Sequence, residues 1–313
     1  MDIELTRYHV TQKVIWDTFI RESKNGLFFF ERDYMDYHAD RFNDHSLIFI
    51  KKDQIIAAFP ANEIDKEIFS HAGLTYGSLV ISEKTKTVEV LEIFTLLINY
   101  YKNSGFSKLL YKAIPSIFFE QPSQEDLYAL FLNNAQLIRR DISSVLPIQN
   151  RLPLANSPAR RYKKCSKLNL EIKENKNFEN YWTLLTNVLA SNHGAKPVHS
   201  LQEIQQLAEK FPNNIKLYEV TENEELLSGT LIFDFGKVLH TQYLANSEKG
   251  REIGALDYLI IKLLEEQFQD RPYFSFGIST ENQGRFLNEG LINQKEMYGG
   301  RAICNDFYEI TLN

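Results

Sequence analysis

The order of apolar and polar segments along the chain is nearly the same in its two halves. Residues 46–64 form an apolar run, a polar turn and a second apolar run, and residues 215–235 repeat this pattern. We expect each pattern to form two strands joined by a short turn. In each half another apolar run then leads to the tripeptide SEK, at residues 82–84 and 247–249, and to a segment with helical spacing of its apolar positions. The chain therefore predicts the same order of strands and helices twice.

Two landmarks place the halves in register. The SEK tripeptides are 165 positions apart (247 − 82), and the only two Trp residues, Trp16 and Trp182, are 166 positions apart (182 − 16). Each Trp lies in a predicted amphipathic helix that is followed by a glycine, Gly26 or Gly194, a residue type that commonly ends helices. A repeat of this length indicates a tandem duplication of a whole domain rather than a solenoid.

Each copy is expected to form a mixed α/β domain. Short turns between its first three strands predict antiparallel pairing, and the helix after SEK predicts a right-handed crossover to a parallel strand. The fold class is thus α/β with a mixed sheet (α+β), in two tandem domains at residues 1–150 and 151–313. The boundary is placed within residues 149–167, which carry prolines and basic residues.

Composition narrows the class of protein. A chain of 313 residues has enough material for two domains with substantial cores. Its net charge of −6 argues against a protein that coats nucleic acid, so no DNA partner is expected. Cys165 and Cys304 lack the spacing of metal ligands and are expected to be free thiols, with no metal bound. The chain shows no signal peptide and no apolar run near ~18 residues, so we expect a cytoplasmic protein with no membrane span.

The duplicated unit resembles the GNAT acyltransferase fold, and the tandem arrangement resembles its FemAB-related branch. Within that group, the sequence is most similar to proteins of bacterial surface-polysaccharide and peptidoglycan gene clusters. The resemblance is carried by VLHTQYLANSEKGREIGALDYLIIKLLEEQF (238–268) and YFSFGISTENQGRFLNEGLINQKEMYGGR (273–301). It implies transfer of an acyl group to an amine. GNAT enzymes take this group from acyl-CoA, whereas FemAB-type enzymes take an aminoacyl group from charged tRNA.

The resemblance places a donor site in the turn NSEKGREIGA (246–255), where free backbone N–H groups before a helix suit a pyrophosphate. The family turn is Gln/Arg-x-x-Gly-x-Gly/Ala; Arg251 and Gly254 match it, and Leu256 departs from it. A simple strand-to-helix turn explains the glycines equally well. The predicted cofactor-binding residues are Ser247, Lys249, Gly250, Arg251, Gly254, Ala255 and Asn282.

The corresponding turn of the first half, SEKTKTVEV (82–90), contains no glycine. We expect no donor phosphate there, and we expect the first domain to supply substrate surface.

Candidate catalytic residues follow from what amine acylation requires, namely a base, a donor for the oxyanion and an acid for the leaving group. Tyr243, on the strand before the donor turn, is the candidate acid, although a packed aromatic explains it as well. His71 and His199 are the candidate bases, because both lie in loops at the ends of elements. Glu281 directly follows a predicted parallel strand, where ligand crevices of α/β sheets open.

Substrate binding is predicted for a basic cluster near the domain boundary and for a lysine of the family-like ending. The cluster suits an acceptor diphosphate, a sugar nucleotide or the end of a tRNA, and a solvated linker is the alternative. Lys295 is equally suited to an internal ion pair. The predicted substrate-binding residues are Arg160, Arg161, Lys164 and Lys295.

The resemblance favours an N-acyltransferase that moves an acyl group, with acetyl the first choice, from acyl-CoA to an amine on a sugar-nucleotide or cell-envelope precursor. The acceptor is a small molecule or a lipid-linked sugar or peptide. Two alternatives stay open: FemAB-type aminoacyl transfer from charged tRNA, and an inactive binding protein that keeps the fold.

Overall fold

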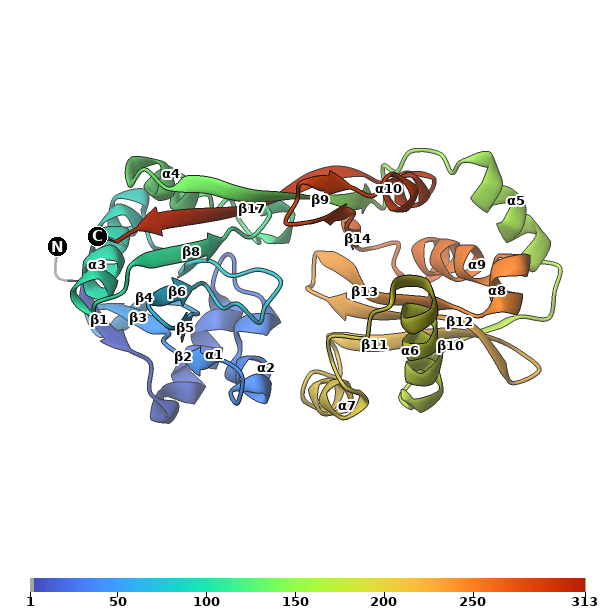
Figure 1. Cartoon of the computed structure of the whole chain (residues 1–313), viewed down its shortest axis with the longest axis horizontal. Coiled ribbons are helices and arrows are strands. Elements are labelled where there is room, and N and C mark those ends of the chain that lie inside the picture. The colour runs from blue at the N-terminus through green and yellow to red at the C-terminus, as the bar shows by residue number, and fades with distance from the viewer. Residues whose placement is uncertain (1–2, 313) are drawn as a thin grey trace. The chain divides into compact units, whose positions relative to one another are not determined.

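The computed structural model describes residues 3–312, without the side chains of residues 192 and 193. The chain forms two compact units (Figure 1). The first contains residues 1–141, 282–285 and 304–313, and the second contains residues 142–281 and 286–303. The expected cut at residue 150 places residues 304–313 in the second domain, whereas their contacts group them with the first unit.

The first unit contains four α-helices among its described residues and a series of short strands. Its helices are α1 (Lys13–Glu22), α2 (Arg32–Met35), α3 (Thr87–Asn103) and α4 (Glu125–Leu132). Its strands are β1 (Glu4–Arg7), β2 (Asn43–Asp44), β3 (Leu47–Lys51), β4 (Gln54–Phe59), β5 (Asn62–Ile64), β6 (Glu67–Phe69), β7 (Val80–Ile81) and β8 (Lys108–Lys112). The strands β9 (Gln136–Pro147) and β17 (Arg301–Thr311) contribute to both units.

The strands of the first unit lie in two sheets. One has the order β1-β3-β4-β7, and its pairs are antiparallel, as the short turns predict. In the other, β6 pairs with β8 in parallel, and β8 pairs with the C-terminal strand β17 through Phe307 opposite Lys112. The predicted parallel pair across the SEK helix is therefore wrong for the first copy, because the hairpin β5–β6 occupies the edge of β8 that β7 would use.

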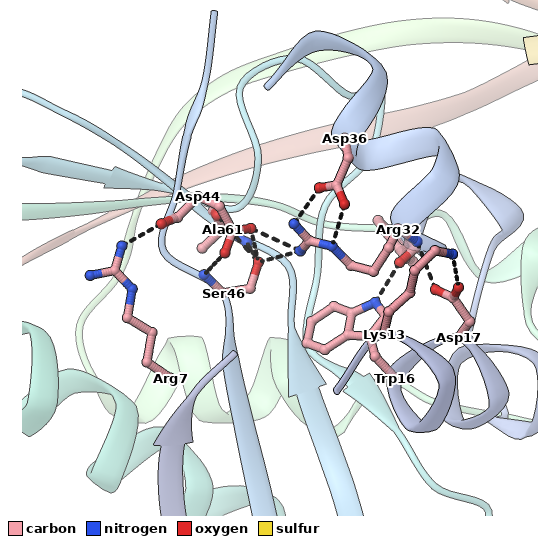
Figure 2. Close-up of polar contacts among 10 residues, drawn as sticks. Arg7, Lys13, Trp16, Asp17, Arg32, Asp36, Asp44, Ser46 and Ala61 are labelled. Atoms are coloured by element: carbon pink, nitrogen blue, oxygen red, sulfur yellow. Dashed lines mark hydrogen bonds and ion pairs between the residues drawn. The ribbon is translucent and has the colours of Figure 1, made fainter. Parts of the chain in front are cut away.

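A buried polar network holds the helical layer of the first unit (Figure 2). Arg32 is 3% exposed, forms ion pairs with Asp36 and Asp44, and stacks on the ring of Tyr8 at 4.0 Å. The fully buried Trp16 donates from Nε1 to the carbonyl oxygen of Phe30 at 2.7 Å. These pairings compensate the cost of burying a guanidinium and an indole N–H.

The second unit follows the same plan with longer strands. Its helices are α5 (Asn156–Cys165), α6 (Glu179–His193), α7 (Leu201–Lys210), α8 (Glu248–Ile253), α9 (Ala255–Lys262), continued by the π-helical turn η5 (Leu263–Gln267), and α10 (Glu289–Glu296). Its strands are β10 (Glu171–Asn175), β11 (Ile215–Glu222), β12 (Glu225–Asp234), β13 (Val238–Asn246), β14 (Tyr273–Ile278), β15 (Thr280–Glu281) and β16 (Phe286–Leu287).

The main sheet of the second unit has the order β10-β11-β12-β13-β14-β9. All neighbours are antiparallel except β13 and β14, which are parallel, as predicted for this copy. Consecutive residues of β13 face opposite sides: Leu244 packs with the α9 core, and Tyr243 contacts Trp182 of α6. Helices therefore cover both faces of this sheet (Figure 1).

Of the two helix ends predicted at glycines, one is found at its glycine and the other is not. Gly194 adopts a left-handed conformation (φ 58°) and caps α6, as predicted. The helix α1 ends earlier, at Glu22, and Gly26 instead packs against the carbonyl of Ile20, where a Cβ would lie 2.0 Å from the oxygen.

Candidate active site

The parallel pair in the second unit separates part-way along its length. Val238–His240 pair with Tyr273–Ser275, and beyond these residues β13 continues beside β12 only, while β14 continues beside β9. His240 and Ser275 are thus the last paired residues before the strands diverge. Beyond this point, β13 and β14 no longer satisfy each other's backbone hydrogen-bonding groups.

A β-bulge lies just after the divergence. Leu231 pairs with Tyr243 and Ile232 pairs with Thr241, so Gln242 is an extra residue on β13. An extra residue in a bulge interrupts the regular ladder and bends the strand locally. The bulge therefore lies two residues beyond the last pair of β13 with β14.

Polar side chains of both strands meet at the divergence. The ring of His240 lies with Nδ1 3.1 Å from Oγ of Ser275, and the Thr241 hydroxyl donates to the carbonyl of Ser275 at 3.4 Å. Burial, reinforced by the charge of Lys295, lowers the pKa of His240 to about 4. His240 is therefore a neutral imidazole at physiological pH.

Lys295 of α10 lies at the end of β14. Its side chain is 5% exposed, and its ammonium group donates to the carbonyl oxygens of Gly277 and Ile278 at 3.0 and 2.6 Å. Burial lowers the pKa of Lys295 to about 8. No carboxylate pairs with it among the described residues, so its charge is held by carbonyl dipoles alone. A buried cation beside an interrupted strand pair suits a developing oxyanion.

The first unit contains a second lysine of the same kind. Lys112, at the end of β8, donates to the carbonyls of Ala72 and Leu74, and burial lowers its pKa to about 7. It lies two residues beyond the last parallel pair of β8 with β6, Leu110 opposite Phe69, and it forms an isolated antiparallel bridge with Gly77. This residue offers an internal comparison for Lys295.

Of the predicted catalytic residues, the structure brings Tyr243 and His199 together. The Tyr243 hydroxyl accepts from the backbone N–H groups of Val198 and His199 at 3.1 and 3.3 Å and lies 2.9 Å from Nδ1 of His199. Burial raises the pKa of Tyr243, and these N–H groups partly oppose the rise. The hydroxyl fixes the loop before α7, so a structural role explains its position fully.

The other two predicted catalytic residues lie elsewhere. Glu281 is exposed on the β15–β16 hairpin and accepts from Asn288 at 2.7 Å. His71 belongs to the first unit, is 2% exposed and has a left-handed backbone (φ 58°). Its ring lies 5.2 Å from that of His38, and burial lowers its pKa well below the usual value. The roles of both residues stay predictions.

Most of the predicted donor turn is used in internal contacts. Ser247 caps α8 by accepting from the N–H of Gly250 at 3.0 Å, and a Cβ on Gly250 would lie 2.2 Å from the carbonyl oxygen of Leu227. Lys249 forms ion pairs with Glu222 and Glu225.

The end of this turn is buried. Gly254 (φ 89°) lies under α5, where a Cβ would come within 2.6 Å of Cβ of Arg161, and Ala255 is fully buried. Arg251 is exposed. Asn282, assigned to the first unit, is an exposed turn residue with φ 48°. The turn's part in donor binding stays a prediction.

The basic cluster lies in the second half of α5 and in the turn after it. Arg161 pairs with Asp257 of α9 at 2.6 Å, and Tyr298 donates to the same carboxylate at 2.8 Å. Arg160 and Lys164 are exposed. The cluster thus divides into one residue that fixes α5 to α9 and others that face solvent.

The N-terminus of α3, the helix after the first SEK, is capped by a side chain of the same helix. Glu89 of α3 accepts from the N–H of Lys86 at 2.8 Å and pairs with Lys51. A carboxylate already occupies the positive end of this helix, which disfavours an anion there.

A cavity of about 610 Å³ lies between α7 and the strands β10 and β11, with Gln205 and Leu217 in its wall. None of the predicted site residues lines it. Within residues 3–312, no group of three or more His, Cys, Asp or Glu residues is arranged to hold a metal, and no helix is long and apolar enough to cross a membrane.

The bulge at Gln242 and the contact between His240 and Ser275 were missed by the sequence reasoning. A bulge depends on the register of two strands, which the sequence of one strand does not reveal. The available signal was the run of polar residues His240, Thr241 and Gln242 within a predicted strand.

No protein-family model matches this sequence, and no curated protein matches it. Solved structures match its fold over nearly the whole chain. FemX superposes with a TM-score of 0.69 at 10% identity, covering 98% of both chains. L-PGS from Bacillus licheniformis superposes with a TM-score of 0.61 at 12% identity, covering 96% of this chain and 92% of that one.

A tandem GNAT protein from the clavulanic acid biosynthesis pathway, solved without AcCoA, gives a TM-score of 0.54 at 10% identity and covers 100% of this chain and 99% of its own. The expected mixed α/β fold of two GNAT-like units, similar to FemX, is confirmed. At these identities the likeness is one of fold.

Proposed function

We propose that the chain is an acyltransferase whose reaction centre lies where β13 and β14 diverge in the second unit. The observation that carries the proposal is the buried ammonium of Lys295 at the end of β14, close enough to lower the pKa of His240, which lies two residues before the bulge at Gln242. The fold shared with FemX and with a tandem GNAT protein supports the same reaction class.

The proposed step joins an acceptor amine to the acyl carbon of the donor. The amine nitrogen attacks the carbonyl carbon, and the carbonyl oxygen becomes an oxyanion. The ammonium of Lys295 stabilises this charge. The bond from carbon to the leaving oxygen or sulfur then breaks, and the proton lost by the amine ends on the leaving group. Tyr243 and His199 remain candidates for carrying that proton.

For the donor, we favour charged tRNA over acyl-CoA. In the turn expected to receive a CoA pyrophosphate, α5 covers Gly254, and Lys249 is held in ion pairs with Glu222 and Glu225. The likeness to FemX agrees with a FemAB-type donor. Acyl-CoA is the second candidate, favoured by the exposed Arg251 beside the glycines of the turn.

The acceptor is proposed to be an amine on a sugar-nucleotide or cell-envelope precursor, small or lipid-linked, with the reaction in the cytoplasm. The amine is the nucleophile that the step requires. An inactive binding protein on the same fold is the alternative, and it predicts no turnover with any donor.

The test compares the two donors in parallel. Purified protein is incubated with tRNA charged with radiolabelled amino acids, or with radiolabelled acetyl-CoA, and with a panel of amino-sugar nucleotides and lysine-containing peptides. Acceptor-dependent movement of label from tRNA into an RNase-resistant product supports the proposal. Transfer of label from acetyl-CoA alone overturns charged tRNA as the favoured donor. If label moves from neither donor, the proposed acyltransferase activity is overturned.

A further inference from the structure

The cations of α5 lie on two opposite faces of the helix. Pro158, Arg161, Tyr162 and Cys165 have the spacing of one helical face, and this face packs on α8 and α9. Tyr162 stacks on Tyr258 with ring centroids 5.8 Å apart. The helix is therefore held firmly by its packing face.

The opposite face of α5 carries a row of exposed cations. At 100° per residue, the row is centred on the side of the helix opposite its packing face. The helical hydrogen bonding continues past the end of α5, since the N–H of Lys167 donates to the carbonyl of Lys164 at 3.2 Å. We name this row the α5 basic face; its members are Arg160, Lys163, Lys164 and Lys167.

The α5 basic face has no internal counter-charge. Residues 156–167 contain no Asp or Glu, and none of the four cations forms an ion pair with another described residue. In a chain of net charge −6, four neighbouring unpaired cations form a local positive field. They span about 10 Å along the helix, since each residue rises 1.5 Å.

We propose that the α5 basic face binds the phosphate backbone of an RNA, the donor tRNA of the proposed function on which this inference rests. A row of Lys and Arg on a packed helix fits a row of phosphates by charge, without reading bases. The helix presents no aromatic or large aliphatic side chain on this face, which disfavours insertion into a bilayer. The same helix covers Gly254, so one element both closes the turn expected for CoA and offers cations for a different donor.

Cations in the last turn of a helix also stabilise its C-terminus. This role would act on folding, whereas RNA binding acts on affinity and on its salt dependence. The two roles are therefore separable by experiment.

The test uses the full chain with Arg160, Lys163, Lys164 and Lys167 all changed to Gln. The matched control changes four exposed lysines of the first unit to Gln, which alters net charge equally; they are Lys52, Lys66, Lys84 and Lys102. Binding of fluorescein-labelled unfractionated tRNA is followed by fluorescence anisotropy between 50 and 200 mM KCl.

For the wild type, four phosphate contacts predict a slope of log K against log salt of about −3.6, a loss of roughly a hundredfold over this range. The α5 variant is expected to bind at least about tenfold more weakly at low salt with a slope near zero, while the control keeps the wild-type slope. Equal weakening in both variants, or no tRNA binding by the wild type, overturns the inference. So does binding to vesicles of phosphatidylglycerol and phosphatidylcholine that depends on the same four residues without tRNA binding.

The outcome is separate from that of the proposed function. If the α5 variant loses tRNA binding and neither protein shows transfer activity, the RNA-binding surface is supported and the proposed enzyme activity is refuted. If the protein transfers acetyl from acetyl-CoA and does not bind tRNA, the acyltransferase activity is supported and the RNA-binding surface is refuted.

Discussion

The ammonium group of Lys295 lies 2.6 Å from the carbonyl oxygen of Ile278, at the end of the strand that diverges from β13. It is held there by two backbone carbonyls and is almost fully buried. A buried cation with no carboxylate beside it is costly to keep in a fold. In the proposed reaction, this cation stabilises the negative charge that develops during acyl transfer.

The pH dependence of transfer tests the charge of Lys295. Its pKa is lowered to about 8, so the protonated form is lost as pH rises above 8. We expect kcat to fall above about pH 8 in the wild type. The Lys295→Arg variant stays protonated throughout, so the fall moves to higher pH. An unchanged alkaline limb in the variant would assign that limb to another group.

His240 predicts an acid-sensitive stability. Its folded pKa is about 4, below the 6.5 of the unfolded chain, so the unfolded state binds more protons between these values. Stability is therefore full above pH 6.5 and falls as pH decreases toward 4, by up to about 3 kcal/mol. Urea denaturation of the wild type and His240→Asn between pH 4 and 7 checks this. Parallel curves for the two proteins would contradict it.

Gly254 predicts a packing constraint between α5 and α9. In Gly254→Ala, the new Cβ would meet Arg161 at 2.6 Å in a backbone with φ 89°. Gly105 has a similar φ of 84° and open space around it, so Gly105→Ala measures the backbone cost alone. We expect Gly254→Ala to lower the free energy of unfolding by about 2 kcal/mol more than Gly105→Ala. Equal losses of unfolding free energy in the two variants would show that α5 moves to accommodate the new Cβ without an added cost in stability.

The hydroxyl of Tyr243 predicts order in the loop before α7. Tyr243→Phe leaves the N–H groups of Val198 and His199 without this acceptor, at a cost of about 1–3 kcal/mol. Faster hydrogen exchange at these two amides is expected. Tyr162→Phe, which loses a 3.3 Å contact to Glu265, is the control and should leave the amides unchanged. Unaltered exchange in Tyr243→Phe would free the hydroxyl for the role of catalytic acid.

The sequence predicts the repeat better than it predicts the site. The duplicated order of strands and the helix cap at Gly194 follow from local periodicity and residue type, which act over a few positions. The pairing of Phe307 with Lys112 joins segments far apart in the chain, and no local signal encodes it. The hairpin at residues 62–69, which separates β7 from β8, likewise changes the sheet through tertiary pairing.

Site residues depend on register and burial even more strongly. Lys295 is recognisable as part of a family-like ending, yet its burial and its carbonyl partners depend on how α10 packs against β14. Gly254 matches a phosphate-binding motif by sequence, whereas the structure places Arg161 over it. A motif gives residue types, and neighbouring elements decide which groups remain accessible.

The most direct test of the reaction centre compares Lys295 with Lys112. Lys295→Met and Lys112→Met each remove an ammonium group that donates to two backbone carbonyls, one in each unit. Single-turnover transfer from charged tRNA is measured for both, with thermal unfolding to confirm the fold. We predict a loss of about 10²–10³ in rate for Lys295→Met, the usual cost of removing an oxyanion donor, and a change of only a few-fold for Lys112→Met. Equal rates in the two variants, or a larger loss for Lys112→Met, would contradict a reaction centre at the divergence of β13 and β14.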